Sequence, residues 1–418
     1  MKHLFLFVFV LLRSTGLYAQ VGIGTSTPKA FLNVAVGRDV LFGENTTNTG
    51  NPNKLFWYAS KAALRAGYVD DASWNSVNLG QYSLATGYNT TANGDYTTAL
   101  GLQTMASGQG AVSLGAYSTA SGTASLAMGN QATASGSTAI ALGFQTMAMG
   151  NYATASGYQS RASGEAAVSM GFSSTASGDA STALGNQTLA SSSGASAIGY
   201  QTTASGLFAT ALGYQTRASG YASTALGANV STNSQVGSFI IGDYSTGYEY
   251  TNQKPYQMMM RFSGGYMLYT SAPLNQSTAI GVQVAANGNA WTTLSDSTRK
   301  ENFRLVDGAT FLRKISAMRL GSWNYKGQEV KNYRHYGPMA QDFFAAFGHD
   351  ELGVIGEDKS INQADFDGVN LIAIQALIQK VEKLEAENAT LKQQVSEMSS
   401  LKSDMEQIKK QLTTLLKQ

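Results

Sequence analysis

The side chains that most often do chemistry in proteins are scarce in this sequence of 418 residues. It has no cysteine and only three histidines, His3, His335 and His349, which lie far apart along the chain. A zinc site needs three or four such ligands, and a disulfide framework needs paired cysteines. We therefore expect no metal, no disulfide and no cofactor.

The glycine-rich middle of the chain also lacks paired carboxylates. Residues 80–227 hold five charged side chains: Asp95, Arg161, Glu165, Asp179 and Arg217. Hydrolysis of a glycan normally uses two carboxyl groups that flank the scissile bond, and these residues form no convincing pair. A formal net charge of +2 gives no basic excess for nucleic acid. A hydrolase of surface polymers is therefore disfavoured, and nucleic acid is not an expected partner.

Four ordered motifs near the C-terminus carry the remaining chemical signal. They read SDSTRKENF (295–303), WNYKGQ (323–328), YGPMAQDF (336–343) and DFDGVNLIAIQALIQKVEKLE (365–385). This region resembles the endosialidase-type intramolecular chaperone domain, which ends phage tail spikes and fibres. The resemblance implies a small α+β domain over residues 295–369 that trimerises, aligns the upstream fibre and often cuts itself off.

The family's cleavage motif, approximately S-D-x-R-x-K-x-N, falls on SDSTRKEN. The resemblance implies Ser295 as nucleophile, Lys300 as general base and Leu294–Ser295 as the bond cut, with Asp296 and Asn302 also matching. The sequence departs at the arginine, because Thr298 stands there and Arg299 follows one residue later. The match therefore supports the fold of the domain more strongly than the cut.

A Ser–Lys dyad makes a physical demand on its surroundings. The pKa of a lysine in water is ~10.4, and it must fall toward ~7 before the amine can accept a proton from serine. Burial in a trimer interface would lower it, so that cleavage would wait for assembly. The alternative is structural: Ser295 or Asp296 caps a turn and Lys300 lies on a solvated face.

The segment that precedes this domain is a regular repeat. From Gly80 to Gly227 every seventh residue is glycine except Ser192, and every second glycine heads a 14-residue unit. Alanine stands five residues after each of the first ten such glycines, from Ala92 to Ala218. Small and larger apolar residues alternate before the glycine, and alternation with period two indicates β-strands. We expect two strands of about five residues per coil, glycine turns with positive φ, and Leu, Ile and Met filling an interior.

So regular a period predicts a solenoid, whose units are stable only when stacked. The units resemble the YadA-like head repeats of trimeric autotransporter adhesins, which implies a left-handed β-roll with three chains side by side. A flexible linker is disfavoured because linkers do not hold Ala and Leu at fixed offsets. Ice binding through threonine is disfavoured too, because Ala132 interrupts the column that contains Thr104 and Thr146.

From residue 370 to 418 the apolar period becomes 3.5, which predicts a coiled coil. Asn388 in the seam would fix its register, and Asp367 or Asn370 is a candidate helix cap. The alternative is one amphipathic helix packed on its own domain. The seam positions are Ile374, Val381, Asn388 and Val395 at a, Leu377, Leu384, Leu391 and Met398 at d, and after a three-residue stammer at Leu401, Met405, Ile408, Leu412 and Leu415.

The remaining segments frame these modules. Residues 1–19 have the features of a secretory signal, with a nine-residue apolar run too short to span a bilayer. Residues 20–79 are predicted to form a β cap, and 228–294 a β neck whose strands turn at Gly264-Gly265. We expect the Gly22-x-Gly24 pair to belong to an extended leader and not to a nucleotide loop.

These inferences together predict a mainly β, homotrimeric, exported fibre at the cell surface or outside the cell, associated with the outer membrane of a Gram-negative bacterium. Its partners would be its own copies and an unidentified surface receptor, protein or glycan, without a direct membrane span. Two alternatives stay open: a prophage tail-fibre protein, and a structural surface protein that does not cut itself. Any enzyme activity would be confined to cleavage of its own chain.

Overall fold

The computed structural model describes residues 21–30, 32–42, 53–271, 279–293 and 295–416. The chain forms two compact units, which meet in sequence between Gly265 and Tyr266. The predicted signal peptide (1–19) lies outside the described residues. Among the helices that are described, none combines the length and the apolar character needed to cross a membrane.

The first unit begins with short strands that close one end of a solenoid. β1 (Val21–Ile23) and β2 (Leu32–Val34) form a parallel pair. β3 (Val40–Phe42), β4 (Asn53–Tyr58) and β5 (Ala63–Tyr68) are antiparallel, and β5 then pairs in parallel with the first coil. The 3-10 turns Ala72–Trp74 and Ser76–Asn78 follow, and the buried Trp74 indole donates to the Thr90 carbonyl at 2.8 Å.

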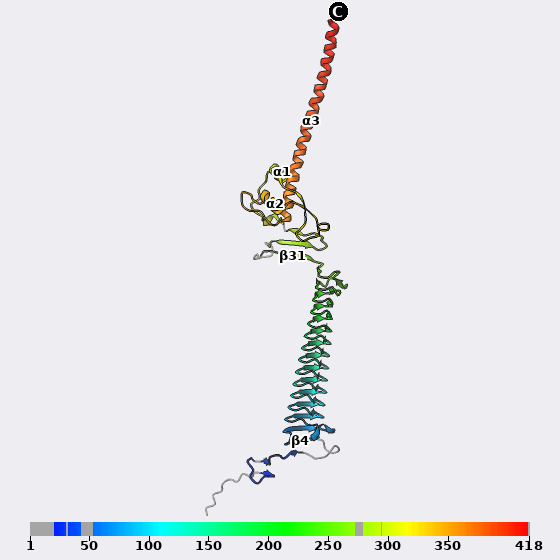
Figure 1. The fold of residues 1–418 in the computed structure, drawn as a ribbon, viewed down its shortest axis with the longest axis vertical. Helices are drawn as coiled ribbons and strands as arrows, with labels where there is room; N and C mark the ends of the chain where they lie inside the picture. The colour runs from blue at the N-terminus through cyan, green and yellow to red at the C-terminus, as the bar shows by residue number, and fades with distance from the viewer. Residues whose placement is uncertain (1–20, 31, 43–52, 272–278, 294, 417–418) are drawn as a thin grey trace, which may run out of the picture. The chain divides into compact units, whose positions relative to one another are not determined.

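The repeat folds into stacked coils, drawn in Figure 1 as the rungs coloured cyan to green. Each coil contributes a five-residue strand to a 16-stranded sheet and a two-residue strand to a 12-stranded sheet. Strands pair in parallel with a shift of 14 residues, so that Gly101 lies opposite Gly115. The five-residue strands are β6 (Leu84–Tyr88), β8 (Thr98–Leu102), β10 (Val112–Ala116), β12 (Leu126–Asn130), β14 (Ile140–Phe144), β16 (Thr154–Tyr158), β18 (Val168–Phe172), β20 (Thr182–Asn186), β22 (Ser196–Tyr200), β24 (Thr210–Tyr214) and β26 (Thr224–Ala228). The two-residue strands are β7 (Thr91–Ala92), β9 (Met105–Ala106), β11 (Thr119–Ala120), β13 (Thr133–Ala134), β15 (Met147–Ala148), β17 (Arg161–Ala162), β19 (Thr175–Ala176), β21 (Leu189–Ala190), β23 (Thr203–Ala204), β25 (Arg217–Ala218), β27 (Val230–Ser231) and β29 (Tyr250–Thr251).

The solenoid prediction is therefore confirmed, but the predicted interior was wrong. The small residues fill the inside of each coil, where Ala141 and Ala148 are 0% exposed. The larger apolar residue before the glycine points outward, and Met128 is 42% exposed. A coil this short brings its two strands so close that only Ala, Ser and Thr fit between them. The threonine column is buried here as well, which removes it from any surface role.

The glycines are required chiefly by close approach between coils. A Cβ added to Gly143 would lie 2.1 Å from the carbonyl oxygen of Gly157, and Gly143 also has φ +121°. A Cβ on Gly136, in the alternate glycine set, would lie 1.9 Å from the Gly150 oxygen, yet Gly136 does not have a left-handed φ. Left-handed turns are taken instead by other residue types, such as Gln145 and Tyr152. The predicted positive φ therefore holds for one glycine set only.

The coils continue beyond Gly227 with longer connections. β28 (Phe239–Gly242) pairs with β26, and β30 (Met258–Arg261) pairs with β28, both in parallel. The expected turn at Gly264-Gly265 does separate two strands, but they belong to different sheets. The second of them, β31 (Gly265–Tyr269), joins β32 (Gly281–Ala285) and β33 (Thr292–Thr293) in a three-stranded sheet.

The second unit packs short elements around the start of a long helix. It contains the 3-10 turn η4 (Ser297–Arg299), α1 (Gly308–Ala317), β34 (Gly321–Trp323), β35 (His335–Gly337), α2 (Ala340–Phe347) and α3 (Gln363–Leu415). Asn362 caps α3, because its side chain accepts from the Ala364 N–H at 2.9 Å. The predicted caps Asp367 and Asn370 lie inside the helix, so those assignments were wrong.

Candidate functional site

The two residues implied as a dyad lie in contact. The Lys300 Nζ donates a hydrogen bond of 2.7 Å to the Ser295 Oγ. The turn η4 brings them together, because it reverses the chain between the two positions. A lysine amine at this distance can accept the serine proton if it is neutral, so the geometry is that of a nucleophile beside a base.

Side chains of η4 hold the turn in shape. Asp296 caps it by accepting from the Thr298 N–H at 2.9 Å, and hydrogen bonding to Thr298 lowers the pKa of Asp296 below its usual value. Arg299 adds a weaker electrostatic contribution, with its Nε 4.0 Å from the Asp296 Oδ2. Arg299 also donates to the Ala279 carbonyl at 3.1 Å. The arginine that is displaced by one residue in the sequence thus ties the turn to the rest of the unit.

The pair lies open to solvent in the single chain. Ser295, Asp296 and Lys300 are all exposed. Leu294, the other side of the implied scissile bond, lies outside the described residues. Asn302 is exposed and has a left-handed backbone (φ 59°), which asparagine tolerates better than most residues. One chain therefore provides the contact between nucleophile and base but leaves both exposed to solvent.

The histidines do not extend this site. His335 lies on β35, where its ring stacks on Trp323 with a centroid distance of 4.7 Å. His349 packs edge-on against Phe344 at 5.1 Å. In the part of the chain that the structure describes, no three His, Asp or Glu side chains gather as metal ligands would.

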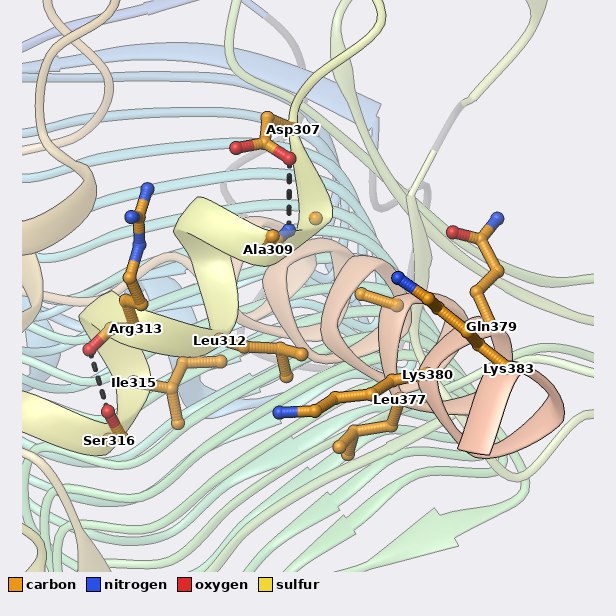
Figure 2. Close-up of a pocket in the computed structure, with 12 residues that line it drawn as sticks. Asp307, Ala309, Leu312, Arg313, Ile315, Ser316, Leu377, Gln379, Lys380 and Lys383 are labelled. Atoms are coloured by element: carbon orange, nitrogen blue, oxygen red, sulfur yellow. Dashed lines mark hydrogen bonds between the residues drawn. The ribbon is translucent and has the colours of Figure 1, made fainter. Parts of the chain in front are cut away.

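A groove between α1 and α3 is a feature that sequence reasoning missed. It has a volume of about 1040 Å³, and Figure 2 shows Leu312 and Ile315 of α1 beside Leu377 of α3. The two helices approach closely, since a Cβ on Gly308 would lie 2.6 Å from the Ala376 Cβ. The signal for α1 was Asp307 before an apolar run, because its side chain caps the helix by accepting from the Ala309 N–H. Leu377, a seam residue of α3, thus lines an apolar groove that no other part of the described chain fills.

The outward side of the five-residue strands forms a second candidate surface. We call it the outer face: the positions three and one before each repeat glycine and the one after it, such as Ile140, Leu142 and Phe144. Its aromatic members stack along the sheet, with the rings of Phe144 and Tyr158 5.0 Å apart. Phe144 is 38% exposed and Met128 42%. Apolar side chains thus recur along the coils, with polar residues such as Ser156 and Asn186 between them, and their own chain covers them only in part.

Two family models match the chain, in two separate regions. The YadA head domain repeat matches in overlapping copies between residues 79 and 229. The chaperone of endosialidase matches residues 295–350. No curated protein matches the sequence. The chain thus combines adhesin-type head repeats with a tail-spike-type chaperone domain, and its architecture is that of an adhesin-like or tail-fibre-like protein.

Proposed function

We propose that three copies of this chain form an exported surface fibre, which the second unit aligns and which recognises a receptor through its coils. The observation that carries the trimer is the outer face, because a half-exposed apolar surface of this extent marks an interaction surface. Packing three outer faces together would bury Leu142 and its equivalents in every coil. The two family matches support the same assembly.

The α3 helix supports the trimer independently. Its apolar seam is exposed along its length: Val381 is 50% exposed, Leu384 53% and Leu391 59%. A 53-residue helix cannot bury such a seam on a much smaller unit, but two further copies of α3 can. This favours the coiled coil over the alternative of one helix packed on its own domain.

The alignment role follows from the uniformity of the coils. A shift of one chain by one coil leaves glycine opposite glycine and alanine opposite alanine, so the repeat alone specifies register weakly. The second unit has no such internal repeat. If three second units assemble first, they select one alignment before the coils pack.

Self-cleavage between Leu294 and Ser295 completes the proposal. Proton transfer from the Ser295 Oγ to a neutral Lys300 Nζ would let the alkoxide add to the Leu294 carbonyl. The C–N bond between Leu294 and Ser295 would then break as the Ser295 nitrogen takes up that proton, which leaves Leu294 joined to the Ser295 Oγ by an ester. Hydrolysis of the ester by water would free the Leu294 carboxylate and the new N-terminus at Ser295. The open position of the pair argues that the cut waits for burial by a neighbouring copy. Ser295 and Lys300 would then act only in the assembled state.

The test is to express residues 20–418 and to measure native and denatured masses. We expect a trimer and a fragment that begins at Ser295, absent from the Ser295→Ala and Lys300→Gln variants. A control variant, Lys326→Gln, removes an exposed lysine of the same unit and should still be cut. A trimer that stays intact would refute the cleavage alone, and a monomer would refute the assembly.

A tail-fibre protein of a prophage is the second candidate, favoured by the chaperone match. The two candidates differ in the route out of the cell. Removal of residues 1–19 during expression in a Gram-negative host, read as a mature N-terminus at Gln20, supports the exported adhesin. An N-terminus at Met1 on assembled particles supports the tail fibre.

A further inference from the structure

One column of the coils carries glutamine at seven positions: Gln103 by itself, and then two sets of three. The first set, which we call the amide ladder, is Gln131, Gln145 and Gln159, and Arg161 follows it. The second set is Gln187, Gln201 and Gln215, and Arg217 follows it at the same offset, 56 residues or four coils later. These glutamine side chains lie outside the core of the coils, where they are exposed or partly exposed.

The amides of the ladder are joined head to tail. The Nε2 of Gln145 donates to the Oε1 of Gln131 at 2.7 Å, and the Nε2 of Gln159 donates to the Oε1 of Gln145 at 2.8 Å. A glutamine amide has two N–H donors and two acceptor lone pairs. Gln145 therefore keeps one donor and one acceptor for a ligand, in a position fixed by its neighbours.

A shallow groove of about 470 Å³ follows the ladder. The three glutamines and Arg161 line it together with Met147 and Thr175. Arg161 is exposed, and its contact in the structure is with the Met147 sulfur at 3.7 Å. Among the described residues no carboxylate lies within ion-pair distance of Arg161, whereas Arg217 has Glu249 at 4.0 Å. The groove thus presents amides in a row and one unopposed cation.

The chemistry of the groove favours a polysaccharide over a peptide or a folded protein. Sugar hydroxyls both donate and accept, as the free half of each amide requires. An extended peptide would need an open sheet edge, but β15 and β17 lie inside a sheet with both neighbours paired. A protein partner would need an apolar or aromatic anchor, and Met147 is the only large apolar side chain in this lining.

We propose that the amide ladder and Arg161 together bind one stretch of a linear polysaccharide that carries carboxylate groups. The glutamines hydrogen-bond its hydroxyls, and Arg161 takes a carboxylate in the two-pronged geometry that guanidinium allows. The second set, four coils or roughly 19 Å away, is a weaker copy because Glu249 competes for Arg217. This proposal names the class of receptor, and it therefore depends on the proposed function of the chain as a surface fibre that binds a receptor.

The test uses polygalacturonate of defined length as the probe and dextran as its neutral counterpart, with the full chain. We expect binding to polygalacturonate alone, weakened by added salt because the decisive contact is ionic. Arg161→Gln should weaken binding about tenfold or more, since a charge-assisted hydrogen bond is lost. Gln145→Ala, which interrupts the ladder, should weaken it severalfold.

The matched control is Arg217→Gln, which removes the same charge from the equivalent column and should weaken binding less than Arg161→Gln does. Equal affinity for polygalacturonate and dextran would overturn the proposal, as would an unchanged affinity of Arg161→Gln. Equal binding of polyglutamate would also overturn it, by showing that charge alone suffices. Light scattering on the same samples measures the oligomeric state. Because each ladder lies within one chain, binding can be tested whether or not the protein is a trimer, and failure of one proposal does not imply failure of the other.

Discussion

The coils and the second unit differ in how far each buries its own side chains and in how unique each is in sequence. The small side chains that point into a coil are buried by their own chain, as Ala183 and Ala190 are at 0% exposure, and the strands in the middle of the stack are paired on both sides. In the second unit the largest buried side chains are Phe343 and Phe347, while the α3 seam is about half exposed. The coils fill their own interior but are nearly interchangeable, whereas the second unit has no internal repeat and leaves the α3 seam exposed. Stability in this molecule is thus provided in one region and specificity in another.

The largest expected effect comes from removing the unique region. Deletion of residues 295–418 removes α1, α2 and α3 and leaves the coils intact. We expect residues 20–294 to keep their β structure but to lose a single trimeric state, giving misaligned or aggregated rods. Circular dichroism and sedimentation of the truncated protein measure the two effects separately. Well-ordered trimers at normal yield would show that the coils align without help.

The next effect tests how tightly the coils are stacked. Gly143→Ala places a methyl group 2.1 Å from the Gly157 oxygen at φ +121°, so we expect a cost of about 3 kcal/mol or more and local unstacking. Faster amide exchange in β14 and β16 would report it.

Gly110→Ala is the matched control for that change. Gly110 has φ +67°, a Cβ there would make only an ordinary contact of 3.9 Å with the Ala124 Cα, and alanine already occupies the equivalent position at Ala124 with φ +52°. We expect a cost of about 1 to 2 kcal/mol, which is the cost of the left-handed backbone alone. Equal costs for the two variants would show that close approach between coils does not explain the glycines.

Much of this contrast could be predicted from the sequence, but the interior could not. The 14-residue period, the β pairing and the long C-terminal helix follow from spacing alone. Which face points inward does not, since alternation of Ala141 with Leu142 is compatible with either side. The outcome depends on the width of the coil, which is a property of the closed structure. The sequence favoured leucine as the core residue because the interiors of most proteins are wide enough to hold its side chain.

The candidate site shows the same division. The motif placed Ser295, Asp296 and Lys300 near one another, and five residues across a turn suffice to bring the first and last into contact. The amide ladder went unnoticed although glutamine recurs two residues after several repeat glycines, because its significance depends on which column faces solvent. Side-chain direction, more than proximity, was the missing information.

A smaller effect sharpens the role of α3. Asn388 lies at an a position among apolar residues, where a buried amide favours one register at a cost in stability. Asn388→Leu should raise the melting temperature of the assembled protein by a few degrees and broaden its oligomeric states. Glu382→Leu is the control, at an exposed b position of the same helix that faces away from the seam. A sharper trimer in Asn388→Leu would contradict a register role.

The smallest effect concerns the last coils and depends on pH. Asp243 accepts hydrogen bonds from Ser245 and Ser263, which lower its pKa, and its carboxylate lies 2.8 Å from Arg261. A lowered pKa stabilises the folded form above the unfolded value of about 3.9, and this stability is lost as pH falls below it. The protection factors of the amides in β28 and β30, which correct for the intrinsic pH dependence of exchange, should therefore fall below about pH 4 in the natural protein. In Asp243→Asn these factors should be lower at pH 7 and change little with acid. If Asp243→Asn still lost protection in acid to the same extent, another group would be responsible for the pH dependence, and the stability of the last coils would not depend on Asp243.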